Sequence, residues 1–319
     1  MIDEPVRSSP AVTFPDSGYS SSERFRKWRQ RNRQAIEAWA LMLPLLIYFS
    51  IFFLFPFISS FVISFVRWAG MGPPPVWVGL KNYIRWITDP YYTQAFTNTA
   101  LFAVSILLIQ TSLAILVALM LNTKVWGRGL YRTAWFIPGL TAASVMANIV
   151  SLFITPGSGI VSLMLSKLGQ PDIIFYMRPD LMRVVIILYS VWRGVGGGVI
   201  LYLAALQSIH PEFYEAARVD GANQGQLLRY ITVPLLAPMT LFVLVTGLIG
   251  TAQIFEAVMF LTKGGPQNQT NVLMYAIYQE AFQNGSLGMA SSGAILLGLL
   301  LLASSIVNIR VMTKGRIQD

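Results

Sequence analysis

Six long apolar stretches alternate with shorter polar stretches along most of the 319-residue chain. A helix needs about 20 apolar residues to cross the hydrocarbon core of a bilayer, and every one of these stretches is long enough. They are Ala40–Phe65, Thr99–Leu121, Ala134–Ile154, Val184–Leu206, Met239–Leu261 and Ala290–Met312. The pattern predicts an all-α integral membrane protein with six transmembrane helices, in which residues 39–312 form the membrane domain.

The composition is typical of a membrane protein and excludes several classes of site. Hydrophobic residues make up 55% of the chain and charged residues 12%, and the mean hydropathy is +0.58, which is too apolar for a soluble domain. There is no cysteine and one histidine, which excludes disulfide frameworks and thiolate or histidine-cluster metal sites. The net charge of +9 could suggest nucleic acid, but the basic residues lie mainly beside apolar stretches, where they orient helices. We therefore expect membrane lipid around the chain, no metal site and no nucleic-acid partner.

The distribution of Lys and Arg predicts which loops face the cytoplasm. Residues 1–38 form a tail that is first rich in Ser and Pro and then basic, with six Lys/Arg between Arg24 and Arg33. The loops and ends on the side of this tail hold 15 Lys/Arg, and the opposite loops hold 7. Because basic residues favour the cytoplasmic side, we expect both termini in the cytoplasm, including a short tail over residues 313–319. The loop between the fourth and fifth stretches, residues 207–235, is then cytoplasmic as well.

That loop has the pattern of two short helices joined at a glycine. Pro211 suits a first helical turn, and Gly221 can take the left-handed conformation that ends a helix. Asn223 can start the second helix, with Gln226 reaching back to it in a capping box. The second helix carries an apolar stripe formed by Leu227, Leu228 and Ile231. Such a compact projection is suited to a groove on a partner protein.

The same loop resembles a known motif. The residues EAA at 215–217, followed after three residues by Gly221 and after nine more by Ile231, with Pro234 closing the stretch, are similar to the cytoplasmic EAA loop of binding-protein-dependent ABC importer permeases. The flanking sequence LAALQSIHPEFY narrows the resemblance to the carbohydrate-type permeases, and further landmarks extend it over roughly residues 40–310. Two positions depart from the family pattern, Val233 where leucine is usual and Gly225 where a bulkier residue is common.

The resemblance implies a fold of the ABC type I importer class in the cytoplasmic membrane of a prokaryote. It implies a permease subunit that is not an enzyme and holds no cofactor: ATP and Mg would lie on two separate ATPase subunits, and the chain indeed lacks a GxxxxGK[ST] phosphate loop. The other implied partners are a second permease subunit, giving a heterodimer, and an extracytoplasmic solute-binding protein that delivers a sugar or sugar derivative. The implied contacts with the ATPase are Glu215, Ala216, Ala217, Asp220, Gly221, Leu227 and Ile231.

Polar side chains inside the apolar stretches are candidate substrate contacts. Arg193 lies near the middle of the fourth stretch, where an arginine costs about 2.5–3.5 kcal/mol on insertion scales, so we expect it to face a polar cavity. Trp192 beside it offers a flat apolar face to a sugar ring. The remaining candidates form two pairs, each expected to share one helix face: Gln253 and Glu256 in the fifth stretch, and Ser144 and Asn148 in the third.

Other interpretations of these residues stay open. Arg193 and Glu256 could form a structural ion pair between helices, and Ser144 and Asn148 could hydrogen-bond to neighbouring helices. The alternative function is an ion-coupled secondary transporter of a small polar solute, which would need intramembrane carboxylates such as Glu256. A membrane-embedded enzyme is disfavoured, because His210 falls in the polar loop and no catalytic set of Ser, His and Asp is visible.

Overall fold

The structure is a computed structural model that describes residues 33–123 and 126–315. The chain divides into two compact units, Met1–Ser59 and Ser60–Asp319, and each is described by itself. Residues 1–32 of the predicted N-terminal tail (residues 1–38) lie outside the described residues, as do residues 316–319, whereas residues 33–38 of that tail are helical.

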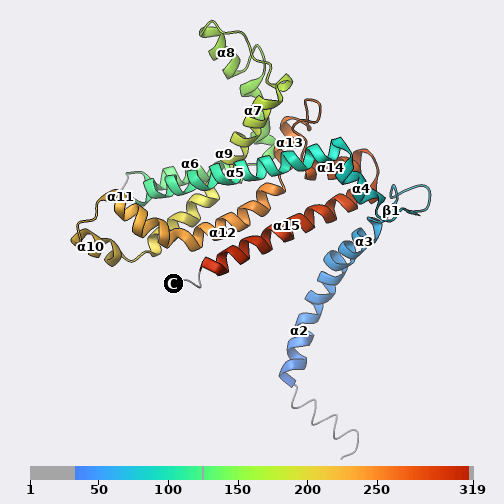
Figure 1. Cartoon of the computed structure of the whole chain (residues 1–319), viewed down its shortest axis with the longest axis horizontal. Coiled ribbons are helices and arrows are strands. Elements are labelled where there is room, and N and C mark those ends of the chain that lie inside the picture. Colours follow the sequence, from blue (N-terminus) through green and yellow to red (C-terminus); the bar gives the residue numbers. More distant parts are fainter. Residues whose placement is uncertain (1–32, 124–125, 316–319) are drawn as a thin grey trace, which may run out of the picture. The chain divides into compact units, whose positions relative to one another are not determined.

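The described part of the first unit is one apolar helical segment. It comprises α2 (Arg33–Phe49), a π-helical turn η1 (Ser50–Leu54) and the start of α3 (Phe55–Ile63) (Figure 1). The π turn lies just before Pro56, whose nitrogen cannot donate the regular helical hydrogen bond. The most apolar window of this segment, within Glu37–Ile63, has no buried residue. An apolar helix that its own unit leaves uncovered needs lipid or another chain around it, which agrees with the first predicted span.

The second unit consists almost entirely of helices. Its long helices are α5 (Pro90–Asn122), α9 (Pro179–Ser208), α12 (Val233–Ala252) and α15 (Leu287–Gly315). The shorter helices are α4 (Lys81–Thr88), α6 (Arg128–Leu140), α7 (Ala143–Ile154), α8 (Ile160–Lys167), α10 (Pro211–Val219), α11 (Gln224–Leu227), α13 (Glu256–Leu261) and α14 (Leu273–Tyr278). Single turns are η2 (Phe175–Met177), η3 (Leu228–Thr232) and η4 (Gln279–Gln283), and the strands β1 (Val66–Arg67) and β2 (Val76–Trp77) pair antiparallel.

The predicted spans have helical counterparts, but the third is not a single straight helix. In the described part of the chain, five helices are long and apolar enough to cross a membrane, and a bent pair makes a sixth. That pair is Gly129–Leu140 and Ala143–Ile154, bent by 100°. The bend follows Pro138, which lacks a backbone N–H and weakens the helix at this point. The third predicted span, Ala134–Ile154, is therefore present as an apolar segment that is broken between Leu140 and Ala143.

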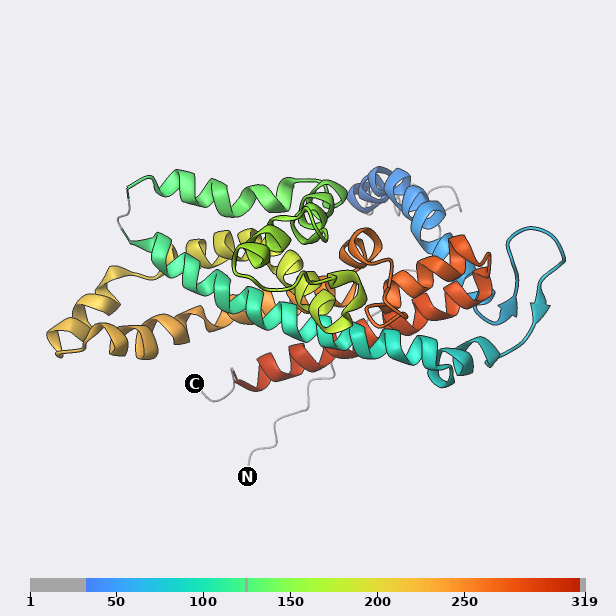
Figure 2. The ribbon, with the colours of Figure 1, turned by 90° about the horizontal axis from the view of Figure 1, so that it is seen from above.

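The long helices α5, α12 and α15 of the second unit run along a common direction, whereas α7 and α8 extend away from them (Figure 1). The polar loop with α10 and α11 lies at one end, and the β1–β2 hairpin lies at the other (Figures 1 and 2). The C-terminal ends of α5, α9 and α15 point toward the end that holds α10 and α11. The end of α15 at Gly315 is thus on the same side of this unit as the EAA sequence.

Small residues let α9 pack closely against α5. A Cβ atom on Gly194 would lie 2.7 Å from the Gln110 side chain, and a Cβ atom on Gly198 would lie 2.9 Å from that of Ala114. Both pairs repeat at a spacing of four residues, so the glycines of α9 meet Gln110 and Ala114 of α5 along one seam. Without water to drive helices together, membrane helices depend on this kind of close backbone approach.

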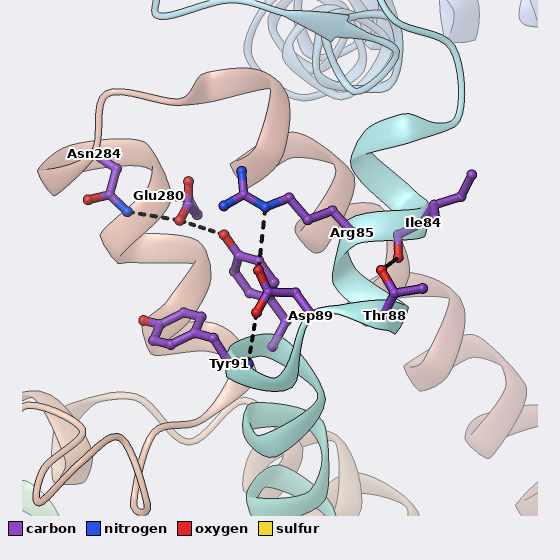
Figure 3. Close-up of polar contacts among 8 residues, drawn as sticks. Ile84, Arg85, Thr88, Asp89, Tyr91, Glu280 and Asn284 are labelled. Carbon is purple, nitrogen blue, oxygen red and sulfur yellow. Dashed lines mark hydrogen bonds and ion pairs between the residues drawn. The ribbon is translucent and has the colours of Figure 1, made fainter.

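At the hairpin end, a polar network joins α4 and α5 to η4 (Figure 3). Asp89 caps α5 by accepting a hydrogen bond from Tyr91 N at 3.0 Å, and it pairs with Arg85 at 3.5 Å. Glu280 is buried, and its Oε1 accepts hydrogen bonds of 2.8 Å from both Tyr92 Oη and Asn284 Nδ2. A buried carboxylate with two donors is satisfied, so this network fixes the start of the second span.

The close approach of α6 and α9 predicts the effect of one substitution. A Cβ atom on Gly196 would lie 2.4 Å from the Trp135 carbonyl oxygen and 2.9 Å from Phe136 Cα, whereas the adjacent Gly197 faces open space. Since backbone atoms cannot give way, we expect Gly196→Ala to lower the free energy of unfolding by about 1–3 kcal/mol. Gly197→Ala, with the same gain in helix propensity, should leave it unchanged or raised. Thermal unfolding of the purified protein measures both, and equal shifts would contradict the observed packing.

Candidate functional site

A cavity of about 540 Å³ opens between the middle of α9, the middle of α5 and the broken end of the fifth span. Its apolar wall includes Ile106, Ile254 and Ala257, and glycines from three helices bring the backbone close. The polar side chains of its wall are Gln110, Tyr189, Ser190, Arg193, Thr251, Gln253 and Glu256. These residues come from positions more than 140 apart in the sequence, so the fold alone assembles the site.

The fifth span is interrupted where it borders this cavity. Helix α12 ends at Ala252 and α13 begins at Glu256, with Gln253–Phe255 outside helical structure. The expectation that Gln253 and Glu256 share a face of one continuous helix is therefore wrong. Both nevertheless line the same cavity, because the turn redirects the chain between them. Irregular backbone at membrane depth is tolerated where it lines a polar cavity.

Arg193 and Glu256 form an ion pair at the cavity wall. Arg193 Nη1 donates to Glu256 Oε2 at 2.6 Å, and the two side chains are 29% and 50% exposed. The prediction that Arg193 faces a polar cavity is confirmed, and the ion pair between Arg193 and Glu256, one of the open interpretations, is present. Half of the glutamate side chain is open to the cavity, so the pair is not sealed inside the helix packing.

Several residues of the wall were not predicted from the sequence. Gln110 Nε2 donates to Gly194 O at 3.1 Å, and Tyr189 Oη donates to Ala143 O at 2.9 Å, which holds both side chains in place. Phe255 adds an aromatic face and packs against the rings of α14. Gln110 could have been found, since it is a polar residue inside an apolar stretch. Phe255 could not, because its position depends on the break after Ala252.

Three of the six predicted path residues lie away from this cavity. Trp192, the neighbour of Arg193, is 41% exposed and lines a separate apolar groove with residues of α7 and α8. Ser144 and Asn148 lie on α7, half-buried and exposed respectively, and are not among the described residues of the cavity wall. The structure thus brings Arg193, Gln253 and Glu256 together and leaves the other three apart from them.

The polar loop has the predicted local structure. Helix α10 ends before Gly221, whose φ is 81°. Asn223 and Gln226 form the capping box, with Gln226 N donating to Asn223 Oδ1 at 3.0 Å and Asn223 N donating to Gln226 Oε1 at 2.8 Å. A hydrogen bond of 3.1 Å between Tyr214 Oη and Thr232 Oγ1 joins α10 to η3. The loop is therefore braced on both sides of its glycine.

The residues predicted to contact the ATPase differ in their exposure: some lie on the surface of the loop, one is buried, and others line a hollow. Glu215 and Ala216 are exposed on α10, while Leu227 is buried and anchors α11. A hollow of about 220 Å³ lies between the two short helices. Its wall includes Ala217, Asp220, Gly221 and Ile231 from the predicted set. The predicted apolar stripe is split, because Leu227 faces inward whereas Leu228 is 40% exposed.

Comparison with known proteins places the chain among transport proteins. Residues 110–311 match the family model described as "Binding-protein-dependent transport system inner membrane component". The chain is 35% identical over 257 residues to the lactose transport system permease protein LacF of Rhizobium radiobacter, covering 78% of this chain and 84% of that protein. It is 32% identical over 283 residues to the arabinooligosaccharides transport system permease protein AraP of Halalkalibacterium halodurans, covering 87% of this chain and 88% of that protein.

A solved structure supports the same relationship. A chain of a bacterial ABC transporter involved in the import of the acidic polysaccharide alginate superposes with a TM-score of 0.78 and 27% identity, covering 91% of this chain and 99% of that one. The fold is that of the ABC type I importer permeases, as predicted, and the comparisons give no support to an ion-coupled secondary transporter. The family match and the relatives together show that this chain belongs to the binding-protein-dependent transport system inner membrane components, the permeases of ABC importers.

Proposed function

We propose that this permease moves a sugar or sugar derivative inward across the cytoplasmic membrane by alternating access. The observation that carries the proposal is the cavity of about 540 Å³ at mid-span, with polar groups converging from several helices. A saccharide presents many hydroxyls and apolar ring faces, and a transient site for it needs hydrogen-bonding groups beside an aromatic surface. The relatives that transport lactose and arabinooligosaccharides support the same substrate class.

Different residues of the cavity wall would contact different parts of a sugar. Gln253 and Glu256 lie where their amide and carboxylate can bond to hydroxyls, and Phe255 between them can pack on a ring face. Phe255 would thus provide the flat apolar face for a sugar ring that the sequence analysis expected from Trp192. Arg193 donates to Glu256 at 2.6 Å and so holds that carboxylate in place at the cavity wall.

The exposed loop is proposed to bind an ATPase. Its surface carries the Glu215 carboxylate and large apolar side chains such as Phe213 and Tyr230, which are 53% and 67% exposed. Two ATPase subunits would bind ATP and Mg and hydrolyse ATP, and their closure would move the loop. The C-terminal end of α15 lies at the same end of the unit as this loop, which supports a cytoplasmic C-terminus, and the charge bias supports a cytoplasmic N-terminus.

Two further partners complete the proposed importer. The apolar segment of the first unit is uncovered within that unit, which supports a second permease subunit beside it, in a heterodimer. An extracytoplasmic solute-binding protein would deliver the sugar, and a related structure holds its transporter in complex with an alginate pentasaccharide-bound periplasmic protein.

The first test of the sugar path concerns Phe255. Phe255→Ala should raise the sugar concentration for half-maximal ATP-driven uptake by roughly 3- to 10-fold, as expected for the loss of about 1 kcal/mol of contact. Trp192→Ala is the control, since Trp192 lies on the separate apolar groove. Uptake by reconstituted transporter, supplied with its binding protein and that protein's sugar, is the measurement. A larger effect of the Trp192 substitution would place the path along the groove instead.

The second test concerns the ATPase contact. Glu215→Ala should weaken ATPase binding by about 1.5–3 kcal/mol, since it removes a charge-assisted hydrogen bond. Glu212, also exposed on α10 but outside the EAA sequence, provides the matched control Glu212→Ala. Copurification of the ATPase and sugar-stimulated ATP hydrolysis report the effect. Equal behaviour of the two variants would argue against a specific role for Glu215.

The third test uses the backbone of the loop. An alanine at Gly221, where φ is 81°, costs about 1–2 kcal/mol, so Gly221→Ala should tilt α10 and reduce coupling of ATP hydrolysis to uptake. Gly225 lies in α11 with no left-handed φ, so Gly225→Ala should retain coupling. The ratio of sugar taken up to ATP hydrolysed distinguishes them, and an unchanged ratio in Gly221→Ala would refute the proposed rigidity of the loop.

A further inference from the structure

The cavity wall contains two opposite charges that cancel. Among the described residues that line it, Arg193 and Glu256 are the two charged side chains, and they are paired at 2.6 Å. The other polar groups of the wall are amides and hydroxyls. This half of the path therefore offers donors and acceptors but no net charge.

The orientation of the pair decides which of its atoms a solute can meet. Arg193 Nε is buried and has no hydrogen-bond partner within the described residues, so this side of the guanidinium faces the protein interior. Glu256 is 50% exposed and uses Oε2 for the pair, while Oε1 makes no hydrogen bond to the described part of the chain. A solute in the cavity thus meets a carboxylate oxygen ready to accept, beside an arginine whose charge is already compensated.

We infer that the pair makes this permease selective for uncharged saccharides over acidic ones. An anionic solute would lose hydration on entry without gaining an unpaired cation, and it would approach the exposed oxygen of Glu256. A neutral hydroxyl can instead donate to that oxygen. The inference rests on the proposed sugar path and narrows its substrate class. Similarity to known permeases does not decide between neutral and acidic saccharides, since a structurally similar permease belongs to an importer of an acidic polysaccharide.

The absence of cysteine from the sequence allows a direct measurement of charge in the cavity. Ser190→Cys places one thiol on the wall, and Ser158→Cys places one at an exposed position elsewhere. In the complete purified transporter, both thiols are treated with an anionic sulfonate and a cationic trimethylammonium methanethiosulfonate, and labelling of this chain is followed by mass spectrometry. The anion-to-cation rate ratio at Ser190→Cys should equal the ratio at Ser158→Cys.

Neutral substitutions of Arg193 and Glu256 then test whether this ion pair determines the anion-to-cation labelling ratio at Ser190→Cys. Adding Glu256→Gln should raise the anion-to-cation ratio by about 5-fold, and adding Arg193→Gln should lower it by about 5-fold, because each leaves one charge uncompensated near the thiol. The double substitution should restore the original ratio, which a merely disordered cavity would not do. A strong charge preference in the parent, or no response to either substitution, would overturn the inference while leaving the sugar path intact.

Protection by sugars tests the substrate class itself. Neutral oligosaccharides, among them lactose, and their matched aldonic acids, such as lactobionate, are added while the Ser190→Cys thiol reacts with uncharged methyl methanethiosulfonate. Neutral sugars should slow the reaction more than their acids, and Glu256→Gln should reduce the difference. Equal or greater protection by the acids overturns the inference. A thiol that no reagent reaches, or that no sugar protects, overturns the sugar path and the inference with it.

Discussion

Inside a bilayer, every backbone N–H and C=O must find a partner in the protein or in a polar cavity. Two spans of this chain break their regular helix, the third after Leu140 and the fifth at Gln253–Phe255. Both breaks border the same cavity, which Gly139 lines beside the first and all three residues line at the second. The cavity supplies polar surroundings to the broken backbone, and the breaks supply the cavity with polar side chains. Site and irregular fold therefore depend on each other.

Much of the architecture was predictable because the signals are local. A run of about 20 apolar residues specifies a span wherever it occurs, and the capping box at Asn223 and the left-handed Gly221 follow from residue types at fixed spacings. Arg193 was also a sound prediction, since its cost in lipid demands a polar neighbour, and the neighbour found is Glu256. These inferences needed only short stretches of sequence.

The remaining features depend on contacts between distant segments. Helix α12 ends at Ala252, where the sequence has no proline. No local pattern therefore predicted the turn that places Phe255 in the cavity wall. Pro138 lies in the third span, but a proline can produce a mild kink or a full break, so the residue alone does not specify the 100° bend that the structure has. Trp192 was misjudged for a related reason, because its neighbour Arg193 points to a different face of the same helix.

The glycine-lined packing of α9 has a mechanical consequence. Arg193 precedes the end of α9 at Ser208 by about 22 Å along the axis, at about 1.5 Å per residue, and only Ile209 and His210 separate that end from α10. Side chains of α5 lie against α9 at Gly194 and Gly198, and the backbone of α6 lies against it at Gly196, so α9 can bend at these glycines only if its neighbours move with it. We therefore expect a displacement of the loop to reach the ion pair along α9, and the chain to yield instead at the three non-helical residues that separate α12 from α13.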